Sequence, residues 1–292
     1  MSIKVFAPAK INLFLEILNL RNDGYHNVNM LMQSVNLCDE LTISKSFDSE
    51  IKVTCDKKLD CSEKDNIVYK LSKKFFEYTG VENPGVRIDI KKIIPEKAGL
   101  AGGSSDGAAT LIGLDKMFET NLPTEKLCAI AEKVGSDIPF CIVGGSALAT
   151  GIGTKISKID SKLNFWTVII KPPIDVSTKE AYESIDKCQD HDLKNPTNIL
   201  DALKQGDLKY LCENLFNRFE ENTQEKEIEK IKKLLLDNGS LGACMSGSGP
   251  SVYGIFKSFE SAKSCEKLMK KYYENVFVCS AIRRGAFLDK NL

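Results

Sequence analysis

The chain has 292 residues, of which 42% are hydrophobic, so it can bury one large core or two smaller ones, and we expect two domains. Its 40 basic and 40 acidic side chains cancel, so no overall charge favours a nucleic acid or an anionic membrane as a partner. The ten cysteines are well separated and there are only two histidines, which argues against a structural zinc site and predicts reduced thiols. No run of about 18 apolar residues occurs, which argues against a membrane span.

The first predicted element is a strand over residues 10–17. Residues 11, 13, 15 and 17 are apolar, so we expect them to share one face and to leave Lys10, Asn12 and Glu16 together on the other. This opening alternates instead of forming an apolar block, so we expect no signal peptide and a cytoplasmic protein. The strand ends at RNDGYH, which favours a turn.

The order of the elements predicts an α+β protein in which strands precede helices in the first domain. A weakly patterned, lysine-rich stretch, residues 154–163, marks the expected boundary, and we divide the chain into residues 1–158 and 159–292. The second part is typical of a ferredoxin-like layer of helices on a small antiparallel sheet. Further strands are predicted over residues 41–44, 51–55, 86–90, 146 onward, 166–170, 251–256 and 276–282, and helices over 67–78, 104–118, 124–134, 197–213, 224–238 and 259–272.

The stretch KAGLAGGSSDGAA, residues 97–109, is rich in glycine, alanine and serine and precedes a predicted helix. Such residues can serve close helix packing, or they can form a loop whose backbone N–H groups bind phosphate at the positive end of a helix. Ser104 and Ser105 add hydroxyl donors, which favours phosphate binding. The spacing matches neither a Walker A loop nor the G-x-G-x-x-G fingerprint.

Three stretches carry a resemblance to a known family: APAKINLFLEI at residues 7–17, PEKAGLAGGSSD at 95–106 and GACMSGSGPSVYGIF at 242–256. In this order they resemble the motifs of the kinase superfamily that includes galactokinase, homoserine kinase, mevalonate kinase and phosphomevalonate kinase. The resemblance is most specific to the 4-diphosphocytidyl-2-C-methyl-D-erythritol kinase family and spans nearly the whole chain. The stretches similar to that family are NLRNDGYHNV at 19–28, DELTI at 39–43 and VGSDIPFCIVGGSALATGIG at 134–153.

This resemblance implies a two-domain small-molecule kinase fold, with a nucleotide-binding N-terminal domain and a C-terminal domain that completes the cleft. It implies transfer of the ATP γ-phosphoryl group to a hydroxyl of a CDP-linked methylerythritol, giving the 2-phosphate, in the non-mevalonate route to isoprenoid precursors. It also makes Asp137 the general base and places Lys10 beside it, where the ammonium favours the charged carboxylate and orients the hydroxyl. Without the resemblance, Asp137 before Ile-Pro would more simply cap a helix.

The resemblance assigns binding residues as well. Tyr25 and His26 match the family's cytosine-recognition pair, and Tyr182 lies where a second stacking aromatic is expected. Thr178, near Tyr182, is a less specific match for a substrate contact. Asn12 is expected to contact polar groups of the substrate. Taken alone, Tyr182 would be a surface tyrosine on a helix. Mg²⁺ is expected with ATP, but no side chain is identified as its ligand. The expected ATP contacts are Asn66, Pro95, Gly99, Leu100, Ala101, Gly102, Gly103, Ser104 and Ser105.

Three other functions fit parts of this sequence. A homoserine or mevalonate kinase would share the loop, although DGYH together with GSDIPF argues against both. A catalytically inactive nucleotide-binding regulator would keep the loop and lose the base, and a binding protein whose glycines only pack would show no ATP affinity. We therefore expect a small-molecule partner that carries a cytidine diphosphate group, and neither a nucleic acid nor a membrane.

Overall fold

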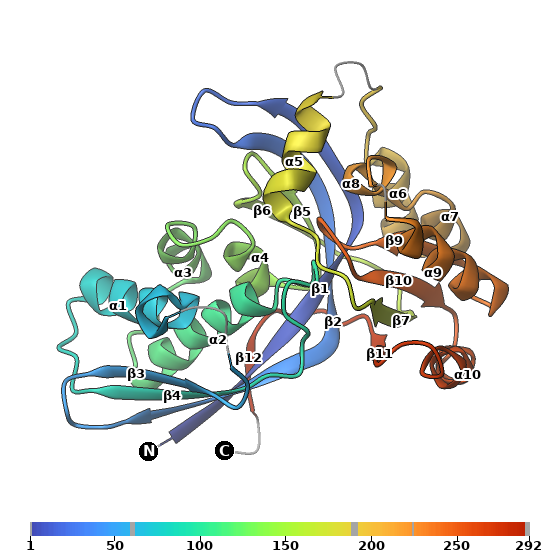
Figure 1. The fold of residues 1–292 in the computed structure, drawn as a ribbon. Helices are drawn as coiled ribbons and strands as arrows, with labels where there is room; N and C mark the ends of the chain where they lie inside the picture. The colour runs from blue at the N-terminus through green and yellow to red at the C-terminus, as the bar shows by residue number, and fades with distance from the viewer. Residues whose placement is uncertain (1, 59–61, 188–191, 224, 290–292) are drawn as a thin grey trace.

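Two β-sheets form the frame of the protein, seen in a computed structural model that describes residues 2–58, 62–187, 192–223 and 225–289 (Figure 1). Within these residues the first sheet has eight strands and the second has four. The first sheet runs β12 (Phe287–Leu288), β1 (Ser2–Leu20), β2 (His26–Lys45), β4 (Val86–Lys91) and β3 (Ile51–Cys55), with β5 (Ser146–Thr150) beside β2, β6 (Lys155–Ile159) beside β5 and β8 (Phe216–Asn217) beside β1. The second sheet runs β11 (Asn275–Ser280), β7 (Trp166–Lys171), β10 (Val252–Phe256) and β9 (Gly242–Met245).

Helices pack on both sheets. The helices of the first part of the chain are η1 (Glu63–Asp65), α1 (Ile67–Thr79), α2 (Gly102–Met117), α3 (Thr124–Ala131) and α4 (Ile138–Val143), of which α2 packs on β1 between α1 and α4. Those of the second part are α5 (Thr178–Lys187), α6 (Thr197–Gln205), α7 (Leu208–Glu213), α8 (Arg218–Glu221), α9 (Lys226–Asp237) and α10 (Phe259–Met269). Because α9 and α10 pack on an antiparallel sheet, the predicted α+β class is confirmed.

Strands β1 and β2 pair along nearly their whole length and connect the two parts of the molecule (Figure 1). The prediction of one apolar face over residues 10–17 is wrong. The pairing slips by one residue between Asn12 and Phe14, so Ile11 and Leu13 lie in one hydrophobic core, whereas Leu15 and Ile17 lie in the other. A β-bulge reverses the alternation of side chains, and one strand can therefore serve two cores.

Local sequence signals set most helix ends. The Asn66 side chain accepts a hydrogen bond from the Val68 N–H at 2.9 Å and begins α1, and Gly80, with a φ of +69°, ends it. The predicted helix over residues 197–213 is wrong as one element, because Gly206 adopts a φ of +84° and separates α6 from α7.

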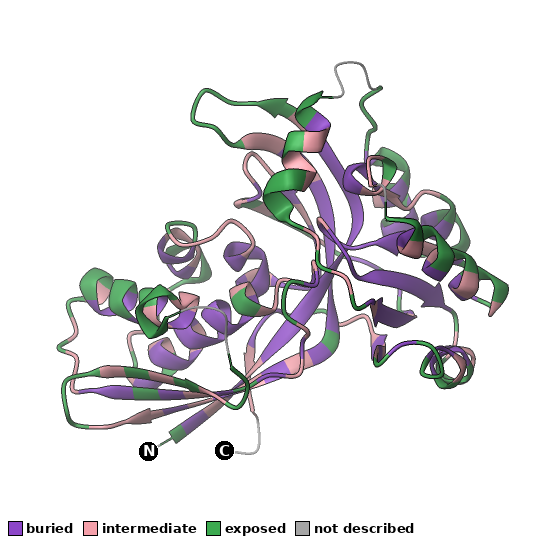
Figure 2. Cartoon of the chain, in the orientation of Figure 1, coloured by how far each residue is buried: buried purple, intermediate pink, exposed green. Residues whose placement is uncertain are grey.

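The predicted boundary region contains a strand that the sequence pattern did not reveal. Residues 154–163 include β6, which pairs only with β5 in the described part of the chain. Because β6 is an edge strand, its residues need not be apolar, which explains the weak pattern in the sequence. The strand that follows, β7, lies in the second sheet, and the last strand, β12, returns to pair with β1. Buried residues follow β1 from one part of the protein to the other (Figure 2). Among the described residues, no helix combines the length and the apolarity that crossing a membrane requires.

Candidate active site

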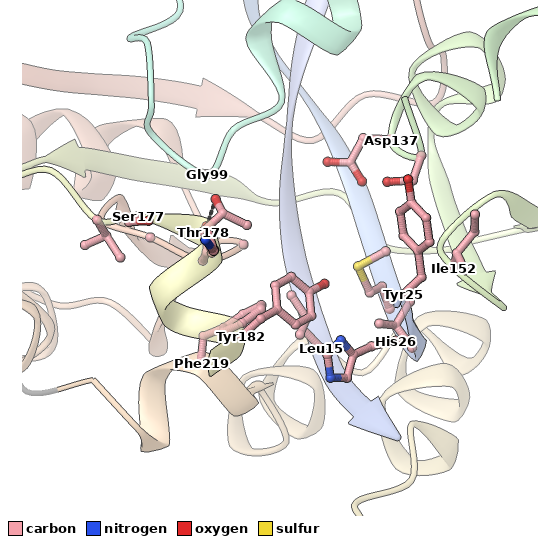
Figure 3. Close-up of a pocket in the computed structure, with 18 of the residues that line it drawn as sticks. Leu15, Tyr25, His26, Gly99, Asp137, Ile152, Ser177, Thr178, Tyr182 and Phe219 are labelled. Atoms are coloured by element: carbon pink, nitrogen blue, oxygen red, sulfur yellow. Dashed lines mark hydrogen bonds between the residues drawn. The ribbon is translucent and has the colours of Figure 1, made fainter. Parts of the chain in front are cut away.

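Two cavities meet at the loop that precedes α2. The larger, of about 840 Å³, extends from this loop past Lys10 and Asp137 to the turn between β1 and β2 (Figure 3). The other, of about 640 Å³ and called the loop cavity below, lies against the loop itself. Lys97, Gly99 and Thr178 line both cavities, so a group held in one can reach a group held in the other at this point.

The glycine-rich loop has a conformation that few other residues could adopt. Gly99 has a φ of +71°, and a Cβ there would lie 2.0 Å from the Ser246 carbonyl oxygen. The Ser246 hydroxyl donates to the Gly99 carbonyl at 2.9 Å, and the Lys10 N–H donates to the Leu100 carbonyl at 3.1 Å. The loop is thus held between β1 and the turn after β9. Because Ala101 has no capping side chain, the N–H groups that begin α2 face the loop without a side-chain acceptor.

The loop cavity gathers most of the expected ATP contacts. Asn66, Pro95 and the loop residues from Gly99 to Ser104 all line it. Ser105 does not, because its buried hydroxyl donates to the Pro8 carbonyl at 2.7 Å and so fixes α2 on β1. The prediction that Ser105 offers a hydroxyl donor to a ligand is therefore wrong, since its donor is already used.

Lys10 and Asp137 lie together on the wall of the larger cavity. The Lys10 ammonium is 3.9 Å from the nearer carboxylate oxygen of Asp137, whose side chain is 30% exposed. Asp137 makes no side-chain capping bond to α4, so the capping interpretation is not observed, and its carboxylate stays open to the cavity (Figure 3). The pair therefore borders the space of the larger cavity.

Asn12 lies beneath this pair instead of in the cavity lining. Its side-chain oxygen accepts a hydrogen bond from the Lys10 ammonium at 2.6 Å and another from the Gly247 N–H at 2.9 Å. Asn12 is fully buried, and its amide nitrogen has no partner in the described part of the chain. The predicted direct contact between Asn12 and substrate is therefore not what this geometry offers. Asn12 orients the ammonium.

The far end of the larger cavity is aromatic. The His26 and Tyr182 rings stack with centroids 4.8 Å apart, and Phe219 packs edge-on against Tyr182 at 4.9 Å. Tyr25 lines the same cavity and is 60% exposed. Burial raises the pKa of the Tyr182 hydroxyl to about 12, so this ring is neutral at physiological pH. The fold thus brings together aromatic residues that are far apart in the sequence.

Helix α5 closes one side of the larger cavity. At its start the Thr178 hydroxyl lies 2.8 Å from that of Ser248, in the turn after β9, and Gly247 and Gly249 of the same turn line the cavity. This turn is held by Asn217, whose amide donates to two carbonyl groups within and next to it, each at 2.8 Å. No role was predicted for Asn217, because no local pattern marks an asparagine whose partners are about thirty residues away.

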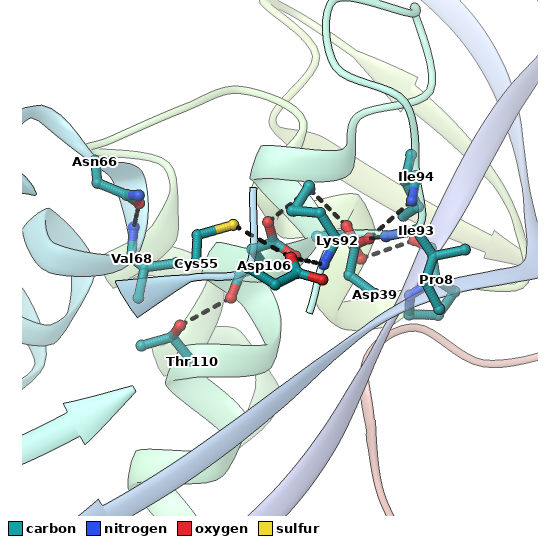
Figure 4. Close-up of polar contacts among 12 residues, drawn as sticks. Pro8, Asp39, Cys55, Asn66, Val68, Lys92, Ile93, Ile94, Asp106 and Thr110 are labelled. Atoms are coloured by element: carbon teal, nitrogen blue, oxygen red, sulfur yellow. Dashed lines mark hydrogen bonds and ion pairs between the residues drawn. The ribbon is translucent and has the colours of Figure 1, made fainter. Parts of the chain in front are cut away.

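A buried ionic cluster beside the loop was not predicted either (Figure 4). Two of its members, Lys92 and Asp106, also line the loop cavity. The Lys92 ammonium lies 2.6 Å from a carboxylate oxygen of Asp39 and 2.8 Å from one of Asp106, while the second oxygen of Asp39 accepts the N–H groups of Ile93 and Ile94. Burial raises the pKa of Asp106 to about 8 against the opposing charge of Lys92. Burial lowers the pKa of Lys92, but the charges of Asp106 and Asp39 outweigh it and raise that pKa overall. Asp39 and Asp106 stand in motifs identified from the sequence, but only the fold shows their shared partner.

Comparison with known proteins agrees with this arrangement. The GHMP kinases N terminal domain matches residues 66–145, and the GHMP kinases C terminal domain matches residues 199–275. The chain is 41% identical over 285 residues to the 4-diphosphocytidyl-2-C-methyl-D-erythritol kinase of Alkaliphilus metalliredigens, covering 97% of this chain and 98% of that protein. It is 41% identical over 283 residues to the enzyme of the same name from Clostridium tetani, covering 96% and 100%.

Solved structures show the same similarity. A crystal structure of 4-(cytidine 5'-diphospho)-2C-methyl-D-erythritol kinase matches with a TM-score of 0.80 and 26% identity, over 96% of this chain and 99% of the other. A homoserine kinase from Cytophaga hutchinsonii matches with a TM-score of 0.78 and 22% identity, over 99% and 97%. The second similarity concerns the fold alone.

Proposed function

Because the chain belongs to the 4-diphosphocytidyl-2-C-methyl-D-erythritol kinase family, we propose that it phosphorylates a hydroxyl of 4-diphosphocytidyl-2-C-methyl-D-erythritol with ATP, giving the 2-phosphate. This step belongs to the non-mevalonate route to isoprenoid precursors. The observation that best supports it is that two cavities meet at the glycine-rich loop, with Lys10 and Asp137 on the larger side. Two ligands bound on either side of the loop would meet beside this pair.

We assign ATP to the loop cavity. Its phosphates would take hydrogen bonds from the N–H groups that begin α2 and from the Ser104 hydroxyl, at the positive end of a helix 16 residues long. Asn66 and Pro95 line the same cavity and would bound the adenosine. Gly99 lines both cavities, which places the γ-phosphate end of the nucleotide next to the larger one.

Mg²⁺ would accompany ATP and offset charge on its phosphate oxygens. In the described part of the chain, no group of three or more His, Cys, Asp or Glu side chains could hold a metal ion. The residues present therefore fit an ion held mainly by the oxygens of the nucleotide, and we name no side chain as its ligand.

We assign the proton transfer to Asp137. The acceptor hydroxyl oxygen attacks the γ-phosphorus, a new O–P bond forms, the bond to the β-phosphate oxygen breaks, and ADP leaves. The hydroxyl proton moves to the Asp137 carboxylate, which is open to the cavity. Lys10, held by Asn12, would orient the hydroxyl and stabilise negative charge that develops on the transferred group.

We assign the cytidine diphosphate part of the acceptor to the far end of the larger cavity. Tyr25 and the stacked rings of His26 and Tyr182 offer flat apolar surface and a few polar edges, which is what a cytosine ring requires. Thr178 lies between this end and the loop, where both cavities pass it. A substrate spanning the cavity would thus have its base at the aromatic end and its alcohol beside Asp137.

We also propose that the chain divides into domains at residues 1–158 and 159–292 and works in the cytoplasm. The boundary lies at the end of β6, just before the chain enters the second sheet at β7. Eight cysteines of the described residues carry free thiols, which fits a reducing compartment where ATP is available.

The experiment that tests this function measures phosphoryl transfer from Mg·ATP to 4-diphosphocytidyl-2-C-methyl-D-erythritol, beside homoserine and mevalonate. Turnover of the cytidylyl compound alone, with the phosphate on the 2-hydroxyl, is expected. A mock preparation from cells that lack the gene, purified in the same way, shows how much activity a contaminating kinase contributes. Turnover of homoserine or mevalonate instead would reject the substrate. ATP binding without transfer to any acceptor would leave a nucleotide-binding protein that is not this kinase.

A further inference from the structure

One hydrogen bond at the aromatic end of the larger cavity has no part in the reaction described above. The His26 Nε2 atom lies 2.8 Å from a carboxylate oxygen of Asp186, near the end of α5. The His26 side chain is only 8% exposed, whereas that of Asp186 is 42% exposed. The pair joins the turn between β1 and β2 to α5, which are 160 residues apart in sequence.

The two nitrogen atoms of His26 are in different situations. A carboxylate accepts hydrogen bonds, so the Nε2 atom facing Asp186 must carry a proton. In a neutral imidazole only one nitrogen carries a proton, and Nδ1 then has a lone pair and acts as an acceptor. Among the described residues, Nδ1 makes no hydrogen bond. Tyr182 stacks on one face of the His26 ring, and His26 lines the larger cavity.

We propose that Asp186 makes the cavity selective for cytosine over uracil by fixing the proton of His26 on Nε2. Cytosine carries an amino group at position 4, which can donate to the Nδ1 lone pair. Uracil carries an oxygen there, which would face that lone pair acceptor to acceptor. This inference rests on the proposed function, because it assumes that the base of a cytidylyl substrate meets His26.

The energetics of unpaired polar groups give the expected size of this selectivity. Two acceptors buried against each other lose more free energy than a good hydrogen bond gains, because water can then hydrate neither the Nδ1 atom nor the uracil oxygen. Such a mismatch corresponds to a preference of about tenfold to a hundredfold. Asp186 does not touch the base in this arrangement, so it is a positioning residue that acts through His26.

The proton position can be measured without any activity. The chain has two histidines, His26 and His191, so a ¹⁵N-histidine sample compared with its His191→Gln variant identifies the His26 ring signals. We expect ¹⁵N shifts typical of a neutral ring protonated at Nε2, and a mixture of tautomers in Asp186→Ala. A ring protonated at Nδ1, or at both nitrogen atoms, in the unmodified protein would overturn the proposal.

Substrate selectivity provides the second measurement. The ratio of kcat/KM for the cytidine substrate to kcat/KM for its uridine counterpart should fall about tenfold in Asp186→Ala, through KM and with little change in kcat. Asp186→Asn should keep most of the ratio, because its amide oxygen still accepts from Nε2. Glu180→Ala removes another exposed carboxylate from α5 and should leave the ratio unchanged.

The outcomes separate this inference from the proposed function. If the unmodified protein phosphorylates the cytidine substrate but Asp186→Ala keeps the full ratio, the role of Asp186 is wrong and the kinase activity stands. If the unmodified protein phosphorylates neither nucleotide substrate, the proposed function fails and the selectivity inference fails with it. A lower kcat in Asp186→Ala at an unchanged ratio would indicate a merely structural role and would also overturn the proposal.

Discussion

Two lysine–aspartate pairs lie beside the glycine-rich loop, one at the larger cavity and one at the loop cavity, and their side chains differ in exposure. In the larger cavity, Lys10 and Asp137 stand 3.9 Å apart and the Asp137 side chain is 30% exposed. At the loop cavity, Lys92 and Asp106 are 2.8 Å apart, and both side chains are at most 5% exposed. A carboxylate that must accept a substrate proton needs an open oxygen. The closed pair instead ties Asp106 to Lys92, which also pairs with Asp39, and Asp39 accepts two backbone N–H groups just before the loop. The open pair is therefore suited to chemistry and the closed pair to holding the loop.

The largest effect expected is from Asp137→Asn, which breaks the open pair. Loss of the base should lower kcat by at least about a hundredfold and by as much as about ten-thousandfold. The urea unfolding midpoint and ATP affinity should stay near those of the unmodified protein, because Asp137 makes no capping bond. Asp160→Asn, at an exposed aspartate outside both cavities, is the control and should keep full activity. Turnover that survives in Asp137→Asn would disprove the base assignment.

The second effect is from Lys92→Met, which breaks the closed pair and leaves the buried Asp39 carboxylate without its cation. We expect a loss of about 3 kcal/mol in the free energy of unfolding, measured by urea denaturation. Lys91→Met is the matched control, since Lys91 is exposed and pairs with Glu40 at the surface, and it should cost less than about 1 kcal/mol. A stable Lys92→Met protein would contradict the structural role given to this pair.

The third effect is from Lys10→Met, which keeps Asp137 but removes its ammonium neighbour. A fall in kcat of about thirtyfold is expected, equivalent to about 2 kcal/mol of transition-state stabilisation. Because the two residues would act on one hydroxyl, Lys10→Met should lower kcat much less when Asp137→Asn is already present. Fully multiplicative losses in the double variant would show that the two side chains act independently.

The smallest effect expected is from Asp106→Asn. Since burial raises the pKa of Asp106 to about 8, the folded protein holds a proton that the unfolded chain releases above the ordinary aspartate pKa. The resulting stabilisation is complete below that ordinary pKa and is lost as the pH rises through about 8. The amide mimics the protonated acid, so at about pH 4 the free energy of unfolding should change by only about 1 kcal/mol, and the difference from the unmodified protein should grow as the pH rises.

Urea denaturation over a pH series checks this prediction. From about pH 5 to about pH 9, the unmodified protein should lose stability relative to Asp106→Asn, which has no proton to release at this position. Parallel curves would mean that Asp106 is ionised in the folded protein, and Asp39 and Asp106 would then place two buried negative charges against the one positive charge of Lys92.

Site residues in contiguous motifs could be predicted from the sequence, whereas residues whose partners lie far away along the chain could not. The loop, Asp137 and the aromatic turn lie in contiguous motifs, so the resemblance predicts roles for them from the order of residues alone. Lys92 carried no such signal, because both of its partners come from other strands and helices. Ser105 was misassigned for a related reason: its motif suggested a ligand contact, but the carbonyl of Pro8, far away in the chain, uses its hydroxyl.

The sequence by itself determined the α+β class, most helices and strands, and the family, because periodicity, capping residues and contiguous motifs are encoded locally. The tertiary structure decided which core each side chain of β1 enters, since a one-residue slip between Asn12 and Phe14 reverses the alternation. It also decided that Asn12 supports Lys10 from below and that Asp186 meets His26. These arrangements depend on contacts between segments that the chain brings together only when it folds, and no local pattern encodes them.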